Sequence, residues 1–194
     1  MTLFFRIAIL GGLLAFAAPG FAATDIDMTL PLTDAWKIGH QQQTKTQRIM
    51  EIVPKEESVE KWTQMVTYLS TKDVTSKPQE IFGLMRRQFE KICTAMSVEE
   101  PKTFQVAGFD ALIASIGCGK SSAQAEGEYT TFFIVTGKKG LYQVSRAWKG
   151  KPFGKDENPL TPAQKAEWKI FFESVGICTA GKDGKPDCVN IPKQ

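Results

Sequence analysis

The 194-residue sequence has one histidine, four cysteines and almost no excess of charge, with 24 basic against 21 acidic residues. Its formal charge of +3 is too small to indicate a nucleic acid or an anionic surface as the partner. We find no internal repeat and no low-complexity tract, which argues against a disordered or fibrous protein. Only one apolar run approaches the length that crosses a bilayer, so a multi-span membrane protein is excluded. What remains is the composition of one globular domain, 42% hydrophobic and 23% charged.

The beginning of the chain has the pattern of a secretory signal. Arg6 precedes a twelve-residue apolar stretch, 7–18, which Pro19 and Gly20 end. Small residues then stand at the two positions that a signal peptidase reads, the second being Ala22. The alternative is a single membrane anchor, for which the run is barely long enough. We expect cleavage after Ala22, a periplasmic or secreted mature chain, and no stable membrane insertion afterwards.

Export to an oxidising space makes the four cysteines candidates for two disulfides, and four cysteines allow three pairings. Cys178 and Cys188 flank a turn-rich loop that can bring its ends together, so we pair them and join Cys93 to Cys118. The alternatives are a redox pair or a zinc site. No C-x-x-C motif is present and His40 is the only histidine, so we expect neither a metal nor another cofactor.

Hydrophobic patterns predict a mixture of strands and helices. A capping box predicts a helix from Ser76, with Gln79 as the partner, and a second one predicts a helix from Thr161, with Gln164 as the partner. Ser58 is expected to cap a short helical turn. Strands are expected at 36–40, 47–53, 65–69, 103–106, 110–116, 128–136 and 141–148.

The apolar run 132–135 predicts a central strand, covered on both faces. A sheet covered on both faces needs a helix on each, so we expect an α+β fold in which helices cover an antiparallel β-sheet. The expected divisions of the chain are a cleaved signal peptide (1–22), a mature N-terminal segment (23–35), a single α+β domain (36–178) and a disulfide-anchored C-terminal tail (179–194).

Four segments carry a resemblance: Trp36, the E-I-V-P sequence at 51–54, the E-S-V-E-K-W-T-Q-M-V-T block at 57–67 and the R-A-W sequence at 146–148. The chain resembles a group of exported proteobacterial proteins with an E-S-V-E-x-W-x-x-M-V-T block, and its cysteines have counterparts there. The match runs from about Trp36 to Cys188. More distantly, the element order resembles the Mog1/PsbP-like layout of an antiparallel sheet between helices. The resemblance implies a sandwich fold and carries over no activity.

Several motifs suggest chemistry but lack essential parts. The segment 117–122 suggests a phosphate-binding loop, yet Ala114 stands where that motif needs its first glycine, so we expect a hairpin loop. His40 could be a general base, but no G-x-S-x-G nucleophile motif accompanies it. The adjacent carboxylates 56–57 and 99–100 are typical of solvated turns.

A basic and aromatic cluster follows the last long strand. Tyr142, Arg146 and Trp148 share one face of a regular strand, and Lys149 follows them. The cluster is either cross-strand packing beside a solvated loop or a rim for an anionic ligand or partner. We interpret the protein as an exported, non-enzymatic binding or assembly module for an envelope protein or a small ligand. The alternatives are an exported hydrolase that uses His40, and a secreted effector.

Overall fold

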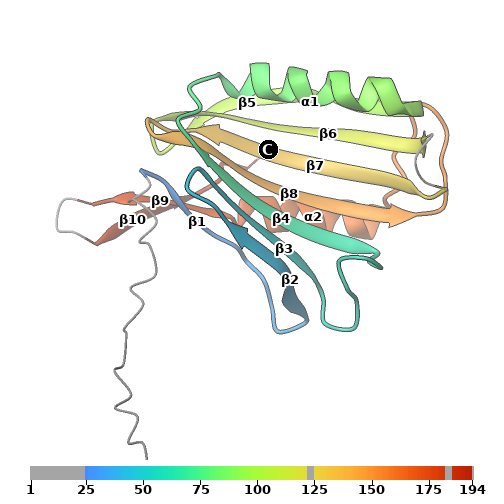
Figure 1. Cartoon of the computed structure of the whole chain (residues 1–194), viewed down its shortest axis with the longest axis horizontal. Coiled ribbons are helices and arrows are strands. Elements are labelled where there is room, and N and C mark those ends of the chain that lie inside the picture. The colour runs from blue at the N-terminus through green and yellow to red at the C-terminus, as the bar shows by residue number, and fades with distance from the viewer. Residues whose placement is uncertain (1–24, 122–124, 182–184, 194) are drawn as a thin grey trace, which may run out of the picture.

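The computed structural model describes residues 25–121, 125–181 and 185–193 (Figure 1). Strands make up 53% of these residues and helices 17%. The elements, in chain order, are β1 (Asp27–Thr29), β2 (Trp36–Gln43), β3 (Gln47–Pro54), β4 (Gln64–Lys72), α1 (Pro78–Ile92), β5 (Cys93–Val106), β6 (Phe109–Ser121), β7 (Gly127–Thr136), β8 (Gly140–Gly150), α2 (Pro162–Glu173), β9 (Gly176–Ala180) and β10 (Pro186–Asn190).

Seven strands form one antiparallel sheet in the order β2-β3-β4-β8-β7-β6-β5. Two runs of hairpins, β2 to β4 and β5 to β8, meet where β4 pairs with β8. Ala107 and Gly108 both have a positive φ, which suits the two-residue turn between β5 and β6. In β7, Phe132 and Phe133 are both buried although they face opposite sides of the sheet. The prediction of a central strand covered on both faces is confirmed for this strand.

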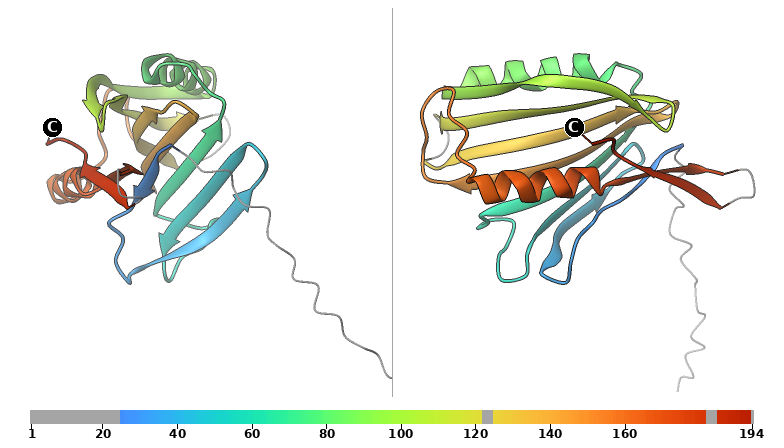
Figure 2. Two further views of the ribbon diagram at one scale, coloured as in Figure 1. Left: turned by 90° about the vertical axis from the view of Figure 1, so that its left-hand side faces the viewer. Right: turned by 180° about the vertical axis from the view of Figure 1, so that it is seen from behind.

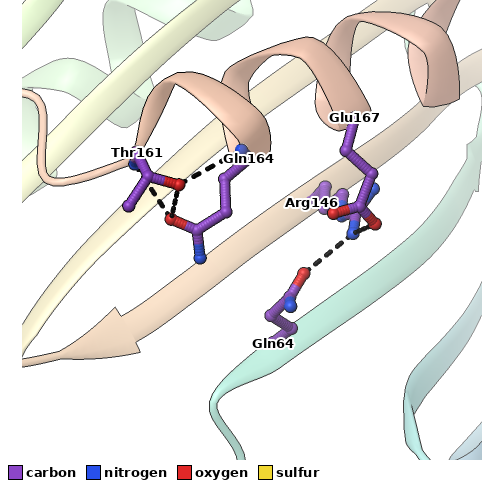
Figure 3. Close-up of polar contacts among 5 residues, drawn as sticks. All are labelled: Gln64, Arg146, Thr161, Gln164 and Glu167. Atoms are coloured by element: carbon purple, nitrogen blue, oxygen red, sulfur yellow. Dashed lines mark hydrogen bonds and ion pairs between the residues drawn. The ribbon is translucent and has the colours of Figure 1, made fainter.

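The two helices lie on opposite faces of the large sheet (Figures 1 and 2). Helix α1 buries Phe82 against one face of β6 and β7, among residues such as Leu112 and Ile134. Helix α2 places Phe171 and Phe172 on the other face. Its beginning follows the predicted capping box: the Thr161 N–H donates to Gln164 Oε1 and the Gln164 N–H donates to Thr161 Oγ1 (Figure 3).

A second, three-stranded antiparallel sheet has the order β1-β9-β10 and lies on the α2 side (Figure 2). The cross-strand disulfide Cys178–Cys188 joins β9 to β10, and Cys93–Cys118 joins the start of β5 to β6. Both predicted pairings are confirmed, and two disulfides fit an exported protein. The predicted leader lies outside the described residues. In the part of the chain that is described, no helix is long and apolar enough to span a membrane.

The expected fold class, an α+β sandwich of Mog1/PsbP type with helices covering the sheet, is wrong. The chain is mainly β, with only two helices among the described residues and two antiparallel sheets. Strands β5 and β6 are much longer than the predicted 103–106 and 110–116. Within β6, Gly119 lies where any side chain would collide with Phe153, and within β5 the pairing register shifts between Glu99 and Lys102. These irregular positions interrupt the alternating pattern of a strand, so both sequences resemble loops.

Local predictions near helix ends also needed correction. Residue Lys77, not Ser76, is the N-cap of α1, and its N–H donates to Glu80 Oε2 at 3.2 Å. The helical turn expected after Ser58 does not form. The residues between Ser58 and β4 instead adopt bends. The proposed hairpin loop at 117–122 begins as strand, because its first five residues belong to β6.

Candidate functional site

A cavity of about 380 Å³ lies between α2 and strands β5, β6 and β7. The sheet supplies a mainly polar wall. From α2 and the segment that precedes it, Leu160, Trp168 and Phe172 form an apolar wall, beside polar residues such as Lys165 and Glu173. Because side chains alternate across a strand, the polar wall carries Ser115 and Thr131, whereas their neighbours Ala114 and Phe132 pack in the core beneath α1. The cavity therefore occupies the α2 face of the sheet.

Glu99 is the centre of a hydrogen-bond network in the polar wall. Its Oε1 accepts from the Tyr129 hydroxyl at 2.6 Å and from Asn158 Nδ2 at 2.9 Å, and its Oε2 accepts from Ser115 Oγ at 3.2 Å. Ser115 Oγ also lies 2.9 Å from Thr131 Oγ1. Donors from three separate segments thus hold one carboxylate in a fixed orientation at the mouth of the cavity.

Tyr129 acts as a donor in this network because its phenol stays protonated. The side chain is buried, with 2% of the residue exposed. Burial raises the pKa of the Tyr129 phenol, and the hydrogen bond to the Glu99 carboxylate raises it further. At ordinary pH the phenol is therefore neutral and donates a hydrogen bond to Glu99 Oε1.

Trp168 forms much of the apolar wall, beside Leu160 and Phe172. It is 3% exposed, and its ring centroid lies 6.3 Å from that of Tyr129 at a tilted angle. Its indole Nε1 is buried and has no hydrogen-bond partner within the described part of the chain. Trp168 therefore brings a large aromatic side chain with an unused donor to the lining of the cavity.

Arg146, one of the predicted site residues, lies under α2 and is not on a rim. Its side chain is 3% exposed, and its Nη2 donates to Glu167 Oε1 at 2.6 Å and to Gln64 Oε1 at 2.8 Å (Figure 3). The guanidinium carbon lies 5.2 to 5.5 Å from the ring centroids of Trp36, Trp168 and Phe171. This residue fastens α2 to the sheet, next to the cavity wall.

The other three predicted site residues lie apart from the cavity. The Tyr142 hydroxyl donates to Asp25 Oδ1 at 2.7 Å, which ties the start of the described chain to β8. Trp148 packs against Phe153, and the Lys149 ammonium lies 3.9 Å from the centroid of the Trp62 ring. The four residues therefore do not converge on one site, although they share a strand.

Sequence reasoning missed the residue at the centre of the cavity network. It placed Glu99 on a solvated turn, because adjacent carboxylates are typical of turns. In the structure Glu99 is exposed but lies in strand β5, next to a register shift. The partners Tyr129 and Asn158 are 30 and 59 residues away in sequence, so no local pattern shows their convergence. His40 lies exposed on the edge strand β2, opposite Glu51.

The cavity provides fixed acceptors and an aromatic wall, which together suit the binding of a small molecule. Among the described residues, no group of three His, Cys, Asp or Glu side chains could hold a metal ion. Comparisons of the chain with protein-family models and with curated proteins found no match.

Proposed function

We propose that the protein is an exported, non-enzymatic binding module that holds a small ligand in the cavity beneath α2. The observation that carries this proposal is the cavity of about 380 Å³, which has one apolar wall and one wall of hydrogen-bonded polar groups. Small-molecule sites in proteins are commonly concave, about 300–1,000 Å³ in volume and apolar except for a few positioned polar groups.

The polar wall is organised before any ligand arrives. Glu99 is held by Tyr129, Asn158 and Ser115, so its carboxylate does not need to be ordered on binding. A rigid site loses less conformational entropy when it binds, which favours affinity. The ligand we expect has an apolar body for the wall of Leu160, Trp168 and Phe172 and one polar group for the network around Glu99.

Three probes of similar size separate the possible polar groups: phenethyl alcohol, phenethylamine and hydrocinnamate. The indole N–H signal of Trp168 in a ¹H–¹⁵N spectrum, assigned with Trp168→Phe, reports occupancy of the cavity. We expect at least one probe to shift this signal in a saturable way. Thr131→Phe places a ring in the cavity and should abolish the shift, because Thr131 lines it.

Thr67→Phe is the matched control, since Thr67 is a threonine of similar exposure on β4, away from the cavity. It should leave probe binding unchanged. The proposal is wrong if none of the three probes shifts the Trp168 signal, or if a shift survives Thr131→Phe.

Export, to the periplasm or beyond, is part of the proposal and is supported by the leader pattern and by two disulfides. Fractionation of the producing cells tests it. Mature chain in the periplasm supports a resident binding protein, and mature chain in the medium supports the secreted-effector version. A chain found in the cytoplasm with four free thiols would contradict export altogether.

A further inference from the structure

A second, smaller hollow of about 120 Å³ adjoins the cavity and shares Glu99, Tyr129 and Asn158 with it. Its other polar lining residues are Ser97, Asp156 and Glu157. Among the described residues, the charged groups in its lining are three carboxylates, and no lysine or arginine of that part of the chain lines it. The larger cavity differs, because lysines from β5 and α2 balance its acidic groups. Positive charge is therefore favoured in the small hollow and not in the large one.

Ser97 supplies an independent sign that this hollow takes a ligand. The residue is 8% exposed, and its buried Oγ has no hydrogen-bond partner within the described part of the chain. Its cross-strand neighbour is Gly117, where any side chain would collide with the Ser97 hydroxyl. A buried hydroxyl without a partner is costly, so a bound donor that reaches Ser97 would be stabilised.

The two remaining carboxylates come from one tight turn that is fixed to β5. Asp156 has a φ of 60°, and its N–H donates to the Met96 carbonyl at 3.3 Å. Glu157 accepts from the Gly154 N–H at 2.7 Å. The turn therefore keeps its acidic side chains beside Glu99 without a basic partner in the hollow.

The chemistry of the hollow favours an organic cation over a metal ion. The described residues hold no group of three carboxylate, histidine or cysteine side chains that could bind a metal, and Glu99 Oε1 already accepts two hydrogen bonds. An ammonium group carries three donors and can bond to separated oxygens, one of them the Ser97 hydroxyl. The shared wall of Glu99 and Tyr129 joins this subsite to the apolar cavity.

We infer that the small hollow is an ammonium subsite and that the ligand class is a primary amine with an apolar body, which occupies the larger cavity. This inference rests on the proposed function. Calorimetric titration with phenethylamine and with phenethyl alcohol tests it, because the two probes differ mainly in charge. We expect the amine to bind at least about tenfold more tightly at low salt and to lose much of this advantage at high salt.

Two substitutions test whether the preference for the amine over the alcohol arises in the small hollow. Asp156→Asn and Ser97→Ala should each reduce the affinity of the amine at least about threefold and leave that of the alcohol unchanged, since only the amine reaches the hollow. Ser97→Ala should not destabilise the fold, because it removes an unpartnered hydroxyl. Asp73→Asn is the control: Asp73 is also exposed and has a similar positive φ of 59°.

The outcomes separate the two proposals. Equal binding of both probes, abolished by Thr131→Phe, would overturn the ammonium subsite and leave the proposed function standing. An amine preference that survives both Asp156→Asn and Ser97→Ala would place the cation elsewhere and also overturn the subsite. If none of the three probes binds, neither the amine, nor the alcohol, nor hydrocinnamate, the proposed function is overturned and this inference with it.

Discussion

Helices α1 and α2 lie on opposite faces of one sheet, but they close those faces differently. Helix α1 inserts Phe82 into a layer of aliphatic and aromatic side chains from β6 and β7. Helix α2 is fastened through aromatic rings and the buried guanidinium of Arg146. A cavity remains on the α2 side, between the helix and the strands.

Strand β6 shows how one segment builds both faces. Leu112, Ala114 and Ile116 point towards α1 and are at most 4% exposed. The alternate positions on the other face include Ser115 and Gly117, a small polar residue and a residue without a side chain. Both faces carry buried apolar residues, with the larger cluster on the α2 face, but only the α2 face also has polar groups and a cavity that a ligand could occupy.

The largest expected loss of stability comes from a substitution on the α1 face. Phe82 is 3% exposed, so Phe82→Ala should destabilise the protein by about 4 kcal/mol in urea denaturation. Leu84→Ala, on the same helix but at a side chain 51% exposed, should cost less than about 1 kcal/mol. Similar losses for the two variants would contradict the view that α1 is held by Phe82.

Next in size are the disulfides, one after each helix. Chain-entropy arguments give about 3.5 kcal/mol for a closed loop of 25 residues and about 2.7 kcal/mol for one of 10 residues. The double variant Cys93→Ala/Cys118→Ala should therefore lose more stability than Cys178→Ala/Cys188→Ala. The reverse order in chemical denaturation would show that the small sheet depends on its disulfide for more than loop closure.

Arg146 tests how α2 is attached. Arg146→Ala should cost about 2–3 kcal/mol, because three ring contacts and two hydrogen bonds are lost. Arg146→Met keeps much of the apolar volume and should cost about half as much.

The matched variant for Arg146 is Glu167→Gln. The Glu167 side chain is 58% exposed, so its loss of charge should change the free energy of unfolding by less than about 1 kcal/mol. A larger effect of Glu167→Gln than of Arg146→Ala would mean that the ion pair, and not the aromatic contacts, holds the helix.

The sequence allowed much of this architecture to be predicted, for identifiable reasons. Turn and capping signals are local, so the hairpin between β7 and β8 and the beginning of α2 were predicted correctly. The disulfide pairing followed from loop length and compartment. The small sheet was missed because its three strands are short, and because β1 pairs with β9 from the other end of the described chain.

The site was harder to predict than the fold. Arg146 carries the signals of a binding residue, a charge among aromatic residues, but burial under α2 gives it three rings and two polar partners within the protein. Glu99 lies beside a second glutamate and is exposed, so its sequence has the pattern of an ordinary surface residue. Its role depends on Tyr129 and Asn158, and that convergence depends on the register of β5, β6 and β7.

The last expected effect is one of pH, and it concerns the α2 face alone. The three tyrosines of the chain, Tyr68, Tyr129 and Tyr142, all lie on that face, and burial raises the pKa of each phenol. Above about pH 10 the unfolded chain loses these protons while the folded chain keeps them, so stability falls as the pH rises. Tyr129→Phe should make the fall between about pH 10 and about pH 12 shallower by up to about 1.4 kcal/mol per pH unit. Parallel curves for Tyr129→Phe and the unaltered protein in urea denaturation would show that the Tyr129 phenol is no harder to ionise in the fold than in the unfolded chain.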